Sequence, residues 1–148
     1  MKKLLFGVML MASISTYAKS YSFEGTSSID GELCKLSFVL DEDNSMTNLH
    51  MEGALKINSI LEEEEKIKPG AIEDSYFNEL FTLKKGSSSS AWVANKKLAE
   101  SGYNNKLGLT FRGESLDNLQ SMQLNSNVRV LLLSIGKVSF DCQDLKAL

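Results

Sequence analysis

Cysteine is the residue type in this sequence with the clearest chemical meaning. Cys34 and Cys142 are the only two cysteines, and they stand near opposite ends of the chain. A redox pair usually has the close spacing Cys-x-x-Cys, and a zinc site would need further cysteines or histidines. In an oxidising compartment, an even number of cysteines with wide spacing is typical of a structural disulfide. We therefore predict a Cys34–Cys142 bridge.

His50 is the single histidine and the first candidate for acid–base chemistry. A catalytic histidine needs a nucleophile or an acid within reach, and the sequence contains no Gly-x-Ser-x-Gly motif that would nominate a serine. His50 stands between Leu49 and Met51, so on a strand it would point away from their apolar face. We interpret it as a solvent-facing strand residue.

Acidic residues gather at two places. Asp41, Asp43, Ser45 and Glu52 match part of a calcium-loop spacing, but Met46 stands where that loop needs glycine. We interpret this segment as an acidic turn between strands.

The run of four glutamates at residues 62–65 is the second place. Glycosidase chemistry needs two carboxylates held across a cleft, whereas consecutive glutamates repel one another and stay solvated. We interpret the run as a charged loop or the start of a helix. The sequence thus predicts no catalytic residues, no metal site and no cofactor.

Residues 1–18 have the layout of a secretory signal peptide. Two lysines are followed by the mostly apolar residues 4–14, and then by small and polar residues up to Ala18. A membrane-spanning helix needs about 20 predominantly apolar residues, so this run is too short for an anchor. We predict cleavage after Ala18, with a cut after Ser20 as the alternative, and a periplasmic or secreted protein.

The remaining residues, 19–148, have a length typical of one domain. Residues 1–18 carry two of the 16 basic residues and none of the 19 acidic ones, so 14 basic and 19 acidic residues remain, a net charge of −5. Nucleic acids and anionic membranes both favour basic surfaces. We expect no nucleic-acid partner and, after signal removal, no integral membrane association. An unknown protein or small ligand is the expected partner.

Strands must position the two cysteines. Apolar residues alternate along residues 32–40 and 138–142, which places each cysteine on an apolar face. The same period predicts strands over residues 21–25, from residue 47 to residue 57, and over residues 107–111. Residues 128–133 and 137–142 are predicted to form a hairpin around a turn at Ile135-Gly136.

The middle of the sequence has a different pattern. Ile72, Tyr76, Leu80 and Leu83 recur at helical spacing and end at Gly86, which predicts a helix. Residues 91–100 weakly indicate a second helix, and residues 115–124 fit helix or strand equally. Phe77, Phe81, Trp92 and Tyr103 are aromatic side chains for the core, for a ligand pocket or for an interface.

The predicted fold is therefore mainly β, an antiparallel sandwich or small barrel with one or two short helices inserted in the middle. An α+β fold is the alternative. Export, a disulfide and scarce catalytic groups favour a binding or interaction module of the bacterial-type envelope or the extracellular space over an enzyme. A small secreted hydrolase with unidentified catalytic residues and a structural envelope component are the alternatives.

Overall fold

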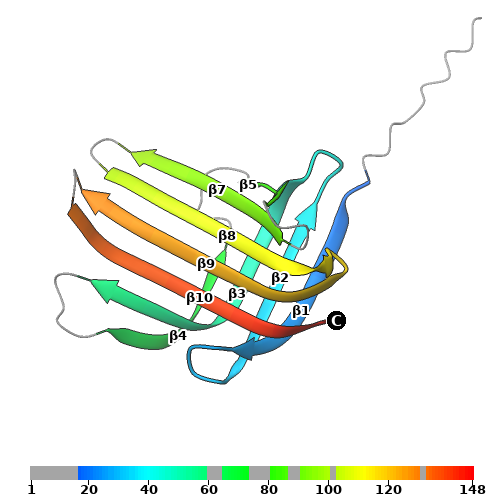
Figure 1. Ribbon diagram of the computed structural model, residues 1–148, viewed down its shortest axis with the longest axis horizontal. Helices are drawn as coiled ribbons and strands as arrows, with labels where there is room; N and C mark the ends of the chain where they lie inside the picture. Colours follow the sequence, from blue (N-terminus) through cyan, green and yellow to red (C-terminus); the bar gives the residue numbers. More distant parts are fainter. Residues whose placement is uncertain (1–16, 60–64, 74–80, 87–90, 101–102, 131–132) are drawn as a thin grey trace, which may run out of the picture.

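The computed structural model describes residues 17–59, 65–73, 81–86, 91–100, 103–130 and 133–148. The predicted signal peptide therefore falls almost wholly outside the described residues. Within them, the regular elements are all β-strands (Figure 1). Their bounds are β1 Lys19–Ser27, β2 Leu33–Leu40, β3 Ser45–Ser59, β4 Lys66–Glu73, β5 Phe81–Thr82, β6 Lys84–Lys85, β7 Ala91–Glu100, β8 Tyr103–Ser115, β9 Asn118–Val130 and β10 Leu133–Ala147.

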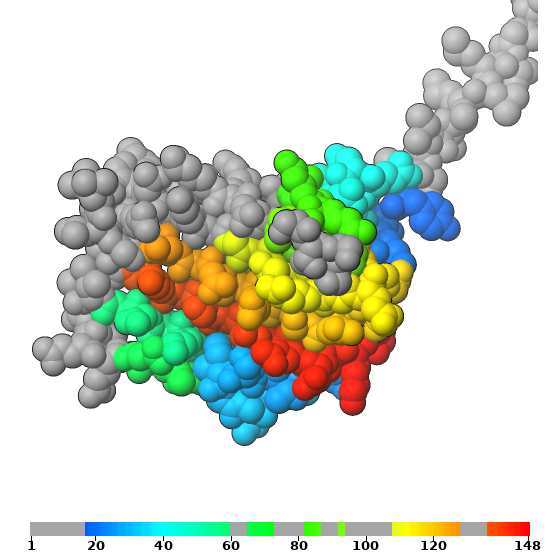
Figure 2. All heavy atoms as spheres, viewed as in Figure 1, coloured from blue at the N-terminus to red at the C-terminus, as the bar shows by residue number. Residues whose placement is uncertain are grey.

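The strands form one antiparallel sheet in the order β4-β3-β2-β1-β10-β9-β8-β7-β6, with β5 paired to β3. Strand β3 also pairs with β10, through residues 56–59 of β3 and 136–139 of β10. Further along, β10 pairs with β1 instead, and β3 pairs with β2. The β1–β2 hairpin therefore lies in a fork between β3 and β10. In the space-filling view its blue atoms lie between the green atoms of β4 and the red atoms of β10 (Figure 2).

The core lies between the two halves of this sheet. Alternate residues of β2 are buried (Cys34, Leu36, Phe38 and Leu40), as the period of two predicts. The ring of Phe38 lies 5.3 Å from the ring of Phe111 on β8, although β1, β10 and β9 separate these two strands in the sheet order. The sheet is therefore folded over, so that β8–β10 cross in front of β1–β3 (Figure 1).

The predicted helices are not seen in the described residues. Residues 91–100, which weakly indicated a second helix, form β7, and β7 pairs with β8 along its whole length. The predicted helix over residues 72–86 begins in β4 and ends in β5 and β6, while residues 74–80 lie outside the described residues. Its apolar spacing was helical, but Leu83 is buried among strand residues of the core. For residues 91–100, pairing with β8 outweighs the weak local preference for helix.

Two other predictions are refined. Residues 118–130 form β9, so the ambiguous segment is a strand over most of its length. The hairpin of β9 and β10 is present, but its turn does not lie at Ile135-Gly136, because β10 already begins at Leu133. Instead, the register shifts between Ser134 and Gly136. A glycine inside a strand often marks such an irregularity rather than a turn.

Candidate functional site

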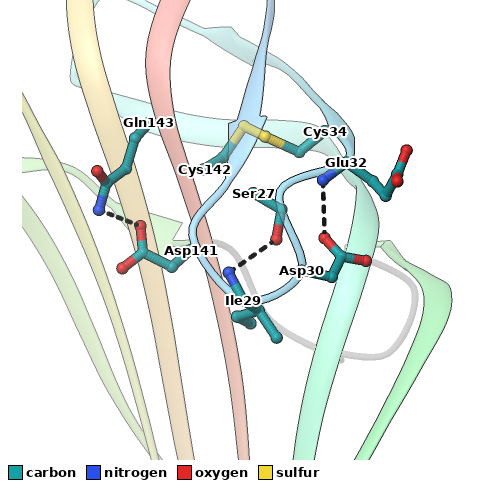
Figure 3. The surroundings of a disulfide bond; sticks show 8 residues. All are labelled: Ser27, Ile29, Asp30, Glu32, Cys34, Asp141, Cys142 and Gln143. Atoms are coloured by element: carbon teal, nitrogen blue, oxygen red, sulfur yellow. Dashed lines mark hydrogen bonds between the residues drawn. A yellow bond between two sulfur atoms is a disulfide. The ribbon is translucent and has the colours of Figure 1, made fainter.

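The disulfide joins two strands that are not neighbours in the sheet. Cys34 lies on β2 and Cys142 on β10, and β1 runs between them. Cys34 is opposite Gly25 of β1, while Cys142 is opposite Ser27. The two Cα atoms are 5.9 Å apart, and both cysteines are fully buried. The bridge therefore crosses over β1 and ties the hairpin into the fork (Figure 3).

Two glycines make room for this crossing. A Cβ atom at Gly25 would lie 3.3 Å from Cys142 Sγ and would overlap the backbone oxygen of Gln143. On the other side of Cys34, Gly53 of β3 has a φ of +155°, and a Cβ there would lie 3.0 Å from the Cβ of Cys34. Gly25 is needed for the close approach of strands, and Gly53 also for its backbone conformation.

The tip of the β1–β2 hairpin is fixed by hydrogen bonds to its own backbone and to β10. The amide of Gly31 donates to the carbonyl of Ser27 (2.9 Å), and the amide of Ile29 donates to Ser27 Oγ (3.2 Å). The amide of Ser28 donates to the carbonyl of Asp141 on β10 (3.2 Å). Ser27 is buried, and its own amide donates to the carbonyl of Glu32 (2.8 Å), so its amide, carbonyl and Oγ all have partners. These hydrogen bonds and the disulfide together hold the hairpin tip in place against β10.

His50 lies on β3, with its side chain on the face opposite to the buried Leu49 and Met51. Its side chain is 39% exposed, and its Nε2 lies 4.0 Å from an oxygen of Glu52. This agrees with its interpretation as a solvent-facing strand residue.

The residues with calcium-like spacing form the turn between β2 and β3. The amide of Ser45 donates to Asp41 Oδ1 (2.8 Å) and to Asp43 Oδ1 (3.0 Å), so both carboxylates serve the turn itself. Hydrogen bonding between the two carboxyl groups raises the pKa of Asp41 and lowers the pKa of Asp43. Glu52 lies further along β3. Within the described part of the chain, no group of three or more metal-binding side chains comes together.

Of the glutamate run, residues 62–64 lie outside the described residues. Glu65 forms an ion pair with Lys56, with 2.8 Å between Lys56 Nζ and Glu65 Oε1.

Among the four aromatic candidates, Phe77 lies outside the described residues, and Phe81 and Tyr103 lie on β5 and β8. Trp92 is half-buried and packs against the core, with Lys85 Nζ 5.8 Å from the centre of its ring.

An apolar pocket lies on the inner face of the sheet, where β3 pairs directly with β10. Its volume is 420 Å³, and its apolar lining comes from Leu55 and Ile57 of β3, Ile72 of β4, Leu124 of β9 and Val138 of β10. Leu55 and Leu124 are buried core residues, whereas Ile57, Ile72 and Val138 are half-buried. The pocket is therefore a continuation of the core that stays open to solvent.

The strand register explains why these side chains converge. Residues directly opposite each other on antiparallel strands point to the same face. Val138 is opposite Ile57 on one side and Ser126 on the other. In the same way, Lys68 of β4 is opposite Leu55, so its side chain stands on the inner face at the β4 side of the pocket.

Two further hollows lie on the outer face. One, of 680 Å³, lies beside the hairpin tip and is lined by Glu32, Leu33 and Glu52 together with small residues of β3 and β4. The other, of 320 Å³, is lined by polar residues of β9 and β10 together with residues of the hairpin tip, β3 and β4. There, Gln123 Nε2 donates to Asp141 Oδ2 at 2.8 Å, so the polar groups already bind one another. Unlike these two, the inner pocket is lined by the buried core residues Leu55 and Leu124.

The sequence predicts the cysteine pair but not this pocket. Alternation placed Leu55, Ile57 and Val138 on inward faces, as it would for a closed core. The opening depends on the fork, which no local pattern indicates.

No protein-family model matches the chain, and no similar protein was found among the curated proteins or among the solved structures. The described part of the chain also contains no helical segment with the length and hydrophobicity of a membrane span.

Proposed function

We propose that this protein is an exported binding module that holds a small, largely apolar ligand in the inner pocket. One observation carries the proposal: a pocket of 420 Å³ with half-buried Ile57, Ile72 and Val138 continues the core on the inner face. Small-molecule sites have volumes of about 300–1,000 Å³ and are lined mainly by apolar side chains. A ligand there would remove apolar surface from water, at about 25 cal/mol for each Å² buried.

The fold suits this role because the pocket walls come from rigid strands. The Phe38–Phe111 contact supports a two-layer, sandwich-like arrangement, in which the pocket opens at one end of the core. The buried disulfide holds β1, β2 and β10 together beside the fork. A pre-formed site of this kind loses little conformational entropy when its ligand binds.

Filling the pocket with a larger side chain should weaken ligand binding. We expect Ser126→Phe to weaken binding of the neutral apolar dye N-phenylnaphthylamine at least about tenfold, a loss of about 1.4 kcal/mol, because the new ring occupies the space beside Val138. Dye fluorescence during titration with protein measures the dissociation constant.

Asn125→Phe is the matched control. Asn125 is the adjacent residue and points to the outer face, where it accepts a hydrogen bond from Ser139 Oγ at 3.3 Å. Asn125→Phe should bind the dye like the wild-type protein. Equal dye binding by all three proteins would contradict the assignment of the inner pocket, as would a loss confined to Asn125→Phe.

We further propose that residues 1–18 are removed on export to the periplasm or the extracellular space. The disulfide supports this, because such bonds persist in oxidising compartments. Strand β1 begins at Lys19, directly after the expected cut. N-terminal sequencing of the protein from the exported fraction should start at Lys19, whereas a chain that still starts at Met1 would contradict the proposal.

A further inference from the structure

The charge at the edge of the inner pocket suggests which class of ligand it holds. Lys68 is the only charged side chain among the described residues that line the pocket. The apolar Leu55 lies directly opposite it on β3, and Pro69, Gly70, Ala71 and Ile72 of its own strand also line the pocket. An ammonium group at the edge of an apolar floor is complementary to a ligand with an apolar body and an anionic end.

The position of Lys68 keeps its charge at the pocket mouth. Lys68 is exposed, while Leu55, opposite it on β3, is buried. The aliphatic stem of lysine can therefore follow the apolar surface while the ammonium group stays in water. Lysine binds anions as a strongly hydrated point charge, which suits a headgroup that remains at the surface.

No acidic side chain stands among the described lining residues to neutralise the charge of Lys68. Glu65, the nearest glutamate along the chain, is paired with Lys56 at 2.8 Å. Lys56 is opposite Ile67 in the register, so it stands on the face opposite to Lys68. The floor of the pocket offers Ser126 as its one hydroxyl among the described lining residues, and its other side chains from β3, β9 and β10 are apolar.

We propose that the inner pocket binds an amphipathic carboxylate, with its hydrocarbon chain on Leu55, Ile57 and Val138 and its carboxylate at Lys68. This assignment rests on the proposed function, because it names the ligand class of the same pocket. The hydrocarbon chain supplies most of the affinity, at about 0.8 kcal/mol for each buried CH₂ group. The ion pair with Lys68 selects the anion over a neutral molecule of the same shape.

Laurate and lauryl alcohol form a matched pair of probes, because they share the hydrocarbon chain and differ at the headgroup. Isothermal titration of the full exported protein should show laurate binding about tenfold more tightly than the alcohol at neutral pH, which corresponds to about 1.4 kcal/mol. Lys68→Gln should remove this preference and leave alcohol binding within about twofold of wild type. Lys68→Arg should keep it.

Lys137→Gln is the control for a general loss of positive charge. Lys137 is an exposed lysine next to Val138 in β10, and it points to the outer face. Lys137→Gln should keep the preference for laurate. Equal binding of laurate and alcohol by the wild-type protein would overturn the headgroup assignment alone. Failure of both to bind, together with failure of the neutral dye, would overturn the proposed function.

Discussion

Replacing both Cys34 and Cys142 by alanine is expected to lower the free energy of unfolding by about 4–5 kcal/mol. The bridge closes a loop with a sequence separation of 108 residues, and in the chain-entropy model such a loop restricts the unfolded chain by that amount. The total stability of a small domain is about 5–15 kcal/mol, so the loss is a large share of it. The variant should be largely unfolded at moderate urea concentrations at which the wild-type protein stays folded.

Urea unfolding followed by tryptophan fluorescence measures this difference, since Trp92 is half-buried against the core. Wild-type protein in reductant is the control, and its stability should approach that of the double variant. Thiol labelling adds a direct check on the bond. Denatured but unreduced wild-type protein should offer no reactive thiol, and labelling of both cysteines would contradict the disulfide. A stability loss below about 1 kcal/mol would contradict its structural role.

Phe38→Ala is expected to destabilise the protein by about 3–5 kcal/mol. Phe38 is 1% exposed, and its ring lies 5.0 Å from Tyr21 and 5.3 Å from Phe111. The substitution removes the ring that joins the two halves of the folded sheet and leaves a cavity between them. Phe38→Leu keeps much of the volume and should cost less than about 1.5 kcal/mol.

A double-mutant cycle distinguishes this contact from general loss of core volume. Phe38→Ala and Phe111→Ala should show a coupling free energy of at least about 0.5 kcal/mol, because the two rings touch across the core. Phe38→Ala combined with a substitution of the exposed Leu33 should be additive. Additive effects for Phe38 and Phe111 would mean that the two halves of the sheet do not pack face to face.

Local alternation was enough to predict the strands that carry the disulfide. In β2 the buried residues Cys34, Leu36 and Phe38 follow the period of two without interruption. Side chains on such a strand meet one core on one face, so their spacing carries the information that the prediction needs. The same applies to Phe140 and Cys142 in β10.

Local sequence patterns gave a wrong prediction where the intrinsic preference and the tertiary environment disagree. Strand β7 is rich in alanine and lysine, which favour helix, yet it pairs with β8 from Ala91 to Glu100. The hydrogen bonds that β7 makes in the sheet outweigh this weak preference. In β10, the glycine at residue 136 resembled a turn residue but lies at a register shift inside the strand.

The roles of Gly25 and Gly53 were hidden in the sequence for a different reason. Neither glycine has a local signal that relates it to Cys34. Their importance depends on β1 and β3 lying on either side of Cys34 in β2. The pocket is hidden in the same way, because Leu55, Lys68 and Val138 meet only through the pairing of β3 with both β4 and β10.

Methyl chemical shifts during titration with laurate show directly whether the ligand occupies the inner pocket, because methyl groups line both this pocket and the outer face. The largest shifts should fall on Leu55, Ile57 and Val138, with little change at Leu33, which is 58% exposed beside the larger outer hollow. Shifts centred on Leu33, or no saturable shifts at the inner pocket, would contradict it.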